Sequence, residues 1–183
     1  MAKRRLRGFD YTSVGAYFVT ICAYERDLLF EDREIQDVIV RCWLEMPEHF
    51  ANVRVDSFVV MPNHLHGIVN IIETEPGSVG QFHEIALQNR VRGTRRGSLS
   101  RIVQAFKAAV TLKLRNDGFI DLDQKVWQSN FYDRVIRDDA ELERVRLYIA
   151  NNPAAWAFDH ENPECEVNAS YVAAWGWLEG VDG

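Results

Sequence analysis

The stretch "VVMPNHLHGIVNII", residues 59–72, restricts the possible folds of this 183-residue chain more than any other segment. It is apolar almost throughout, which is typical of a strand in the interior of a sheet. Two histidines, His64 and His66, nevertheless lie in it with one residue between them. Because successive side chains of a strand point to opposite faces, both imidazoles lie on one face, together with Ile68 and Asn70. The segment therefore predicts a core strand with two neighbouring imidazoles on one side.

The apolar pattern along the rest of the chain predicts the element order β-α-β-β-α-β, followed by a third helix. The Pro and Asn of "MPN" (61–63) indicate a tight turn, so the strands on either side of it form an antiparallel hairpin. This order is that of the ferredoxin-like α+β folds, in which the first and third strands lie in the middle of the sheet. We therefore expect the histidine strand to be central. The expected strands are 16–24, 53–60, 64–72 and 126–136, and the expected helices are one capped by Asp32 and ended by Pro47, then 98–118 and 138–153.

An apolar content of 47% and a charged content of 26% suit one domain with a sizeable core. We interpret residues 1–183 as a single domain with a basic N-terminal arm (1–15), a mobile basic loop (73–97) and an acidic, aromatic tail (154–183). No apolar run of ~18 residues predicts a membrane span. The basic N-terminus lacks the apolar centre of a signal peptide, so a cytoplasmic protein is expected. The three cysteines are far apart and odd in number, which fits neither a disulfide framework nor a zinc ribbon.

Charge is distributed unevenly along the chain. The net charge is −6, but residues 138–183 alone carry ten acidic residues and two arginines, whereas residues 1–137 have a net charge of +2. Two local basic runs, "KRRLR" at 3–7 and "RVRGTRR" at 90–96, lie in the first part. This asymmetry permits a nucleic-acid partner, and it is equally compatible with charges that only keep the protein in solution.

The predicted helix 138–153 carries a candidate partner for the two imidazoles. Tyr148 and Asn152 lie one helical turn apart, on one edge of the apolar face. If the helix packs that face on the sheet, a tyrosine hydroxyl and an amide oxygen lie opposite the histidines. The apolar face consists of Leu142, Val145 and Ile149.

Each of these residues also has a purely structural interpretation. His64 and His66 could be a pair of hydrogen-bonded core histidines rather than metal ligands. Tyr148 could be a boundary residue of an amphipathic helix, and Asn152 could be the C-cap before Pro153. The combination of an H-x-H strand with this helix edge is more specific than any of its members.

The same combination identifies a resemblance. "HLH" in a strand, followed by a tyrosine on a later helix, resembles the HUH transposases that act on single strands with one tyrosine, and most closely the REP-associated tyrosine transposase group. The similarity extends over roughly residues 8–153. Its segments are "GAYFVTICAYER", "VVMPNHLHGIV", "SLSRIVQAFKAAVT" and "VWQSNFYDRVIRDDAELERVRLYIANNP".

The resemblance implies a metal-dependent single-stranded DNA endonuclease and strand transferase. It implies that His64 and His66 bind Mg²⁺ or Mn²⁺, with Asn152 as the third protein ligand. Tyr148 would be the nucleophile that attacks a phosphodiester and leaves a 5′-phosphotyrosine and a free 3′-OH. A metal would stabilise the charge that develops on the phosphate, and the covalent intermediate would conserve the bond energy for rejoining.

The resemblance also implies that the partner is single-stranded or hairpin DNA, bound by a monomer or a homodimer. The basic residues of the N-terminal arm would contact the target strand, and those of the loop 73–97 would contact a hairpin stem. Lys107 could lie beside the sheet as a further contact, or be an ordinary solvated helix lysine. The expected DNA-binding residues are Lys3, Arg4, Arg5, Arg7, Arg92, Arg95, Arg96 and Lys107.

Several alternatives remain open at the level of sequence. Tyr132 and Tyr171 are competing candidates for the nucleophile. His49, His83 and His160 lack partners at a metal-binding spacing and are interpreted as surface or structural residues. Two other functions compete with the transposase reading. One is a DNA-binding protein that keeps the fold and has lost cleavage. The other is a metal-dependent hydrolase of small phosphoesters, which would use the histidines without covalent catalysis.

Overall fold

A computed structural model describes residues 13–73 and 98–179, and in this part of the chain a four-stranded antiparallel sheet has the strand order β2-β3-β1-β4. Two helices, α1 and α2, connect the strands in the ferredoxin-like manner, so the expected α+β fold is confirmed. The histidine strand β3 is central, between β2 and β1. In the described ranges the strands are β1 Gly15–Cys22, β2 Val53–Met61, β3 His64–Ile71 and β4 Tyr132–Ile136, and the helices are α1 Arg33–His49, α2 Leu99–Asn116, α3 Asp139–Asn151 and α4 Ala169–Glu179. The 3₁₀ segments described there are η1 Tyr24–Arg26, η2 Leu29–Glu31 and η4 Asn152–Phe158.

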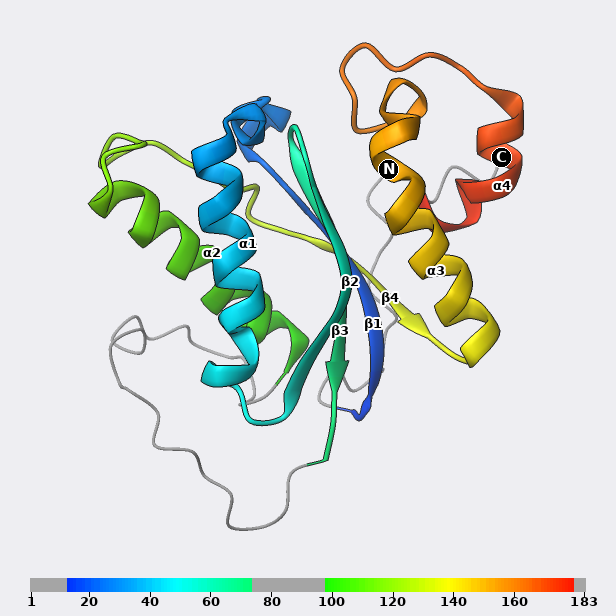
Figure 1. Ribbon diagram of the computed structural model, residues 1–183, viewed down its shortest axis with the longest axis horizontal. Helices are drawn as coiled ribbons and strands as arrows, with labels where there is room; N and C mark the ends of the chain where they lie inside the picture. Colours follow the sequence, from blue (N-terminus) through cyan, green and yellow to red (C-terminus); the bar gives the residue numbers. More distant parts are fainter. Residues whose placement is uncertain (1–12, 74–97, 180–183) are drawn as a thin grey trace.

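The helices α1 and α2 cover one face of the sheet, as Figure 1 shows. Trp43 of α1 is fully buried there and packs edge-on against Phe106 of α2, with ring centroids 5.4 Å apart. The same indole lies directly over Gly67 of β3, where a Cβ atom would come within 2.4 Å of it. Gly67 therefore allows the bulky Trp43 to approach the strand that carries the histidines.

The helix α1 begins as expected but continues beyond its expected end. The Asp32 side chain accepts hydrogen bonds from the N–H groups of Glu34 and Ile35, as an N-cap should. The expectation that Pro47 ends this helix is wrong, because α1 extends to His49 with Pro47 inside its last turn. Proline removes one intrahelical donor there, whereas the N–H of Phe50 still bonds to the Met46 carbonyl and closes the final turn.

The fourth strand is shorter than the predicted 126–136. Within the described residues, the ladder with β1 comprises Tyr132–Ile136, and Trp127 forms an isolated bridge with Ala23, the residue that follows β1. The segment 126–131 turns instead toward α2, where the Lys107 ammonium donates to the carbonyls of Gln128 and Asn130, each at 2.8 Å. The continuous ladder with β1 begins after this region, at Tyr132.

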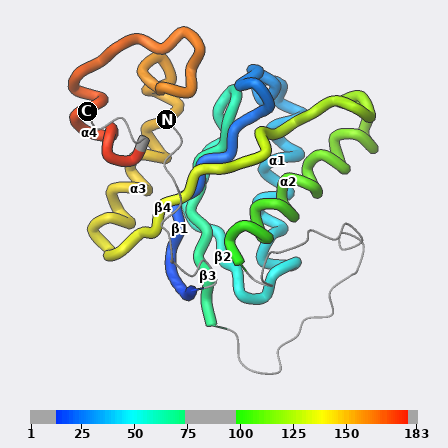
Figure 2. Tube along the Cα trace, turned by 180° about the vertical axis from the view of Figure 1, so that it is seen from behind, coloured from blue at the N-terminus to red at the C-terminus, as the bar shows by residue number. Residues whose placement is uncertain are grey.

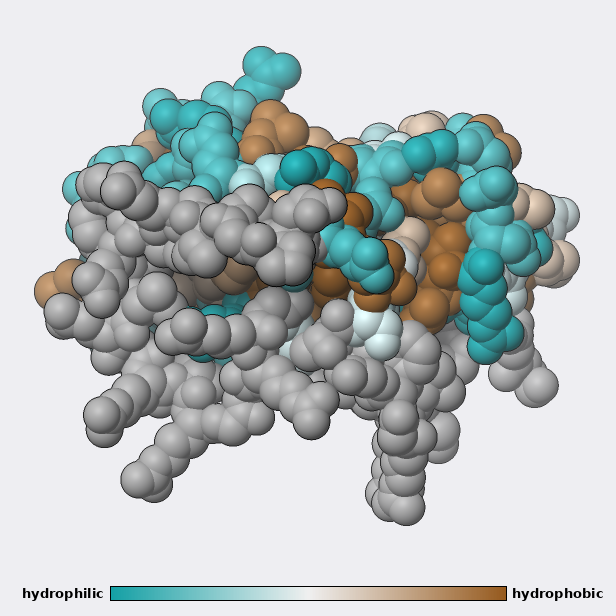
Figure 3. Space-filling view, turned by 90° about the horizontal axis from the view of Figure 1, so that it is seen from below, coloured by the Kyte–Doolittle hydropathy of each residue, from teal (hydrophilic) through white to brown (hydrophobic). Residues whose placement is uncertain are grey.

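The opposite face of the sheet is covered by α3, η4 and α4, which the views in Figures 1 and 2 place together on the far side from α1 and α2. The tail predicted at 154–183 thus supplies a helix of its own, and its Tyr171 and Leu178 are buried against the sheet face that carries Phe18 and Ile68. Figure 3 shows apolar residues, in brown, toward the side of the molecule where α3 lies. Within residues 13–73 and 98–179, none of the helices has the length and apolarity needed to cross a bilayer.

The predicted N-terminal arm and basic loop fall almost entirely on residues outside the described ranges, which exclude 1–12 and 74–97. Seven of the eight expected DNA-binding residues fall in these segments, outside the described residues. They are Lys3, Arg4, Arg5, Arg7, Arg92, Arg95 and Arg96.

Candidate active site

The two histidines of β3 lie side by side on the face covered by α3 and the tail. His64 is 0% exposed and His66 is 2% exposed. Their Nε2 atoms are 2.9 Å apart, and their rings meet at 4.3 Å between centroids. The strand alternation that predicts a shared face is therefore observed, and it brings two potential ligand nitrogens to one point.

The outer nitrogen of each imidazole has its own partner. The His64 Nδ1 lies 2.9 Å from Oδ1 of Asn63, the last residue of the turn before β3. The His66 Nδ1 lies 2.9 Å from the hydroxyl of Thr20, its register partner on the neighbouring strand β1. These hydrogen bonds at the two Nδ1 atoms fix the orientation of both rings, so their Nε2 atoms point toward each other in the interior of the site.

Tyr148 reaches this point from α3. Arg146, two residues earlier on α3, forms a two-pronged ion pair with Asp56 of the edge strand β2, which fastens α3 to the sheet. The Tyr148 hydroxyl lies 3.1 Å from His66 Nε2, and its ring packs on Phe18 and on Trp175 of α4. Tyr148, on the helix edge deduced from the sequence, therefore contacts one of the two histidines.

A carboxylate from the tail completes the cluster. Asp159, just after η4, is 0% exposed, and its Oδ2 lies 3.6 Å from His64 Nε2 and 3.9 Å from His66 Nε2. Among the described residues, ligand atoms of these three side chains all lie within 4.8 Å of one another. Sequence reasoning missed Asp159, because its only local signal is one acid among several in an acidic tail that could not be placed.

This donor set fits a divalent cation. The Asp159 Oδ2 is buried and accepts no hydrogen bond from the described residues, whereas Oδ1 is satisfied by the Glu161 N–H at 2.8 Å. A buried carboxylate oxygen without a donor is costly unless a cation or a water serves it. Two imidazole nitrogens and a carboxylate suit Mn²⁺ and related divalent ions.

Asn152, expected as the third metal ligand, is the first residue of η4 and is 1% exposed. Within the described part of the chain, neither its amide nitrogen nor its amide oxygen has a hydrogen-bond partner. A buried amide without partners is uncommon and points to a missing ligand or water. The role of Asn152 as a ligand stays a prediction, and Asp159 is now a second candidate for the same role.

The electrostatics of the cluster favour a neutral imidazole beside an ionised carboxylate. Burial and, to a smaller extent, the neighbouring His66 lower the pKa of His64 to about 3, although the charge of Asp159 acts to raise it. Burial acts to raise the pKa of Asp159, but its contacts with His66 and His64 and the Glu161 N–H hold it below the usual range. A neutral histidine and an aspartate anion are the protonation states that bind metals.

This arrangement predicts how stability depends on pH in the metal-free protein. The folded-state pKa of His64 lies below its ordinary value of 6.5, so between pH 6.5 and about 3 the unfolded chain binds one more proton than the folded one. The contribution of His64 to the free energy of unfolding is therefore fully present above pH 6.5. Below that pH it falls by roughly 1 kcal/mol per pH unit. Urea unfolding in a chelator from pH 8 to 4 measures this slope. A His64→Gln variant should lack it, and an equal slope in that variant would contradict the assignment.

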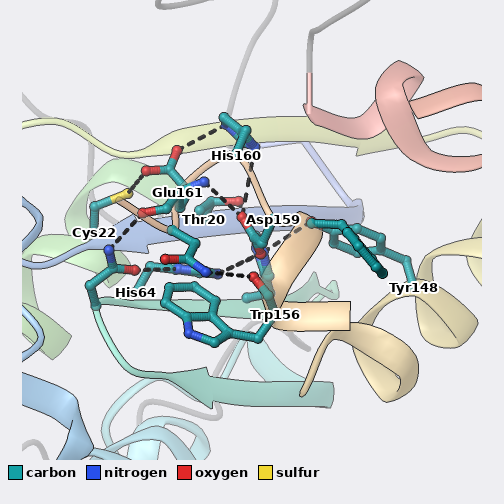
Figure 4. Close-up of polar contacts among 12 residues, drawn as sticks. Thr20, Cys22, His64, Tyr148, Trp156, Asp159, His160 and Glu161 are labelled. Carbon is teal, nitrogen blue, oxygen red and sulfur yellow. Dashed lines mark hydrogen bonds and ion pairs between the residues drawn. The ribbon is translucent and has the colours of Figure 1, made fainter. Parts of the chain in front are cut away.

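The residues beside Asp159 fasten the tail to the site, as Figure 4 shows. The Glu161 carboxylate pairs with Arg26 of η1 at 2.9 Å and with His160 at 3.0 Å. Its backbone carbonyl accepts a hydrogen bond from the Asn63 side chain at 2.7 Å. Burial and the Glu161 charge raise the pKa of the nearby Cys22 thiol to about 12, so this cysteine is a packing residue. His160, interpreted from sequence as a surface or structural residue, lies next to the site, where it contacts Glu161.

The remaining candidates occupy distinct positions. Burial lowers the pKa of Lys107 to about 8, and its ammonium is committed to the two carbonyls of the 126–131 segment, so its DNA contact stays a prediction. Tyr132 lies on β4 opposite Thr20 in the register. Tyr171 is buried in α4 beside Phe158. Of the three tyrosines, Tyr148 is the one for which a contact with the histidines is observed.

Comparison with known proteins places this geometry in context. No protein-family model matches the sequence. An uncharacterised protein of Haemophilus influenzae Rd is 38% identical over 164 residues, which cover 85% of this chain and 89% of the relative. The structure of the REP-associated tyrosine transposase bound to a REP hairpin matches with a TM-score of 0.58 and 17% identity, over 84% of this chain and 73% of that one. The structural match confirms the resemblance at the level of the fold.

Proposed function

We propose that this chain, which belongs to the same family as the Haemophilus influenzae protein and has the fold of the REP-associated tyrosine transposase, is a metal-dependent single-stranded DNA endonuclease and strand transferase. It would act on hairpin-forming DNA through a covalent 5′-phosphotyrosine, as in transposition. The observation that carries the proposal is the 3.1 Å contact between the Tyr148 hydroxyl and His66, within a buried cluster of two histidines and one aspartate.

In this proposal Tyr148 is the nucleophile. Its phenolic oxygen forms a bond to the phosphorus of a phosphodiester, and the bond from phosphorus to the 3′ oxygen breaks, so the leaving strand ends in a 3′-OH. The reverse reaction, attack of a 3′-OH on the phosphotyrosine, rejoins strands without an external energy source. Phe18 and Trp175 hold the tyrosine ring from two sides, which limits its hydroxyl to a small range of positions over β3.

We propose that His64, His66 and a third oxygen ligand, Asp159 or Asn152, bind Mg²⁺ or Mn²⁺. The bound cation would supply charge stabilisation at the scissile phosphate. The protein contributes a water-poor site, in which both histidines and Asp159 are at most 2% exposed, and a neutral His64 imidazole that need not lose a proton to bind the metal.

The DNA partner in this proposal is a hairpin-forming single strand, because the solved transposase of this fold is bound to a REP hairpin. The basic residues predicted as DNA contacts, in segments 3–7 and 92–96 and at Lys107, would provide local positive charge on a chain of net charge −6. A cytoplasmic location, and a monomer or homodimer as the active form, belong to the same proposal.

The direct test is adduct formation by the wild-type protein. Hairpin oligonucleotides with a 3′ label are incubated with the protein and Mn²⁺ or Mg²⁺ and run on denaturing gels. We expect a covalent protein–DNA species that depends on the metal and disappears when a chelator is added first. Hairpin binding in native gels without any adduct, across varied hairpins and both metals, would refute the cleavage proposal.

A second function, hairpin binding without cleavage, is favoured by one observation. Tyr148, His64 and Asp159 are all at most 2% exposed, so a phosphodiester can reach them only if η4 or the tail moves. A protein that keeps this closed arrangement would bind DNA outside the cluster. Turnover of small phosphoesters without DNA affinity would refute both functions and favour a simple metal-dependent hydrolase.

A further inference from the structure

We propose that Asn63 and Thr20 are positioning residues that set the tautomers of the two histidines. Asn63 holds His64 in the metal-binding tautomer at all times, whereas Thr20 permits His66 to change tautomer when a metal enters. The inference rests on the proposed metal site, but it makes a statement about the metal-free protein that can be tested separately.

The first step follows from the amide group of Asn63, which is 0% exposed. Its Nδ2 lies 2.7 Å from the Glu161 carbonyl oxygen and 3.3 Å from the Arg26 carbonyl oxygen. Carbonyl oxygens only accept, so the NH₂ group must face them and Oδ1 must face His64. Since an amide oxygen also only accepts, the hydrogen of His64 is on Nδ1, 2.9 Å away. The Nε2 of His64 therefore presents a lone pair.

The second step follows from the short contact between the rings. The Nε2 atoms of His64 and His66 are 2.9 Å apart, and two lone pairs at that distance would repel. Because His64 Nε2 has no hydrogen, the hydrogen of the contact belongs to His66 Nε2, and the Tyr148 hydroxyl, 3.1 Å from the same nitrogen, accepts from it rather than donating to it. The Nδ1 of His66 is then a lone pair, and the Thr20 hydroxyl donates to it at 2.9 Å.

Metal binding requires a change at one ring only. His64 already offers its Nε2 lone pair, whereas His66 must lose the Nε2 hydrogen and gain one at Nδ1 by exchange with water, and it stays neutral. The Thr20 hydroxyl can rotate from donor to acceptor and serve both tautomers, because a hydroxyl has one hydrogen and two lone pairs. An Asn at position 20 could not do this without flipping its amide. Asn63 is thus a rigid hydrogen-bond partner of His64 Nδ1, whereas Thr20 is an adaptable partner of His66 Nδ1.

Nitrogen-15 NMR of the imidazoles tests the tautomers without reference to activity. In chelator-treated protein we expect His64 as the Nδ1–H tautomer and His66 as the Nε2–H tautomer. Addition of Zn²⁺, used as a diamagnetic probe, should convert His66 to Nδ1–H and shift both Nε2 signals. The Nδ1–H form of His66, or the Nε2–H form of His64, in metal-free protein would overturn the inference. Correct metal-free tautomers with no response to Zn²⁺ would instead refute the metal site.

Matched variants at position 20 test the role of the hydroxyl. Thr20→Val keeps the shape and removes the hydrogen-bonding oxygen, so we expect Zn²⁺ and Mn²⁺ affinity to fall by about 10–100-fold in calorimetry. Thr20→Ser retains the hydroxyl and should stay close to wild type. Thr111→Val, which removes a hydroxyl that bonds only to the Lys107 carbonyl on α2, is the control and should not change affinity.

A purely structural role of Thr20 would give a different pattern. Serine and valine would then both weaken metal binding, in proportion to their loss of unfolding free energy. That result would overturn the assignment of Thr20. If Thr20→Val does not fold, the Ser variant and the wild-type NMR spectra still decide the question, because each makes its own prediction about His66.

Discussion

Replacement of Tyr148 by phenylalanine is expected to eliminate the covalent protein–DNA adduct and the nick, with a loss of activity of about a thousandfold or more. Phenylalanine keeps the ring that packs on Phe18 and Trp175 and removes the oxygen that lies 3.1 Å from His66. Hairpin binding and Mn²⁺ binding should persist. The unfolding free energy should fall by about 1 kcal/mol, the value of one hydrogen bond.

Denaturing gels of 3′-labelled hairpins, followed by peptide mapping of the adduct in the wild-type protein, measure this effect. Tyr132→Phe is the matched control, since Tyr132 lies on the neighbouring strand β4 and its register partner is Thr20. This variant should form the adduct at a rate near that of the wild type. An adduct mapped to Tyr132 or Tyr171 would show that the nucleophile has been assigned to the wrong residue, without affecting the fold.

Loss of either histidine is expected to remove measurable Mn²⁺ binding. His64→Ala and His66→Ala each delete one of two converging Nε2 atoms, and the remaining ligands cannot replace a nitrogen at that position. Isothermal calorimetry on variants whose fold is verified by circular dichroism measures the loss. His49→Ala is the control, because His49 is an exposed histidine in the last turn of α1, on the opposite side of the sheet from the site. Unchanged Mn²⁺ affinity in both folded variants would show that His64 and His66 are hydrogen-bonded core histidines rather than metal ligands.

The same calorimetry decides which residue is the third ligand. Asp159→Asn should lower the affinity by about 10–100-fold if the buried Oδ2 binds the cation. Asn152→Ala should do so if the amide oxygen is the ligand. A large loss in the first variant and none in the second would replace the ligand set implied by sequence with His64, His66 and Asp159. Wild-type affinity in both variants would exclude both side chains as ligands.

The strand that carries the site, and the face that its two histidines share, could be predicted from local patterns in the amino-acid sequence. Alternation along residues 59–72 places His64 and His66 on one face, and a local rule of this kind needs no knowledge of the rest of the fold. The register of α3 is local in the same way, which is why Tyr148 could be assigned to the helix edge that lies over the histidines. The element order likewise predicted the central position of β3, because the ferredoxin-like connection permits few strand orders.

The position of the tail could not be predicted from the sequence, because it depends on contacts between distant segments. Asp159 is 95 positions from His64 in the sequence, and no periodicity relates an acid in an irregular segment to a distant strand. Its position depends on the Glu161 contacts with Arg26 and Asn63, which bring three separate segments together. The limits of α1 and β4 were not predicted either: α1 closes a further turn beyond Pro47, and the segment before β4 bonds to Lys107 of α2. Local patterns specify faces and registers, whereas the joining of distant polar groups depends on the complete fold.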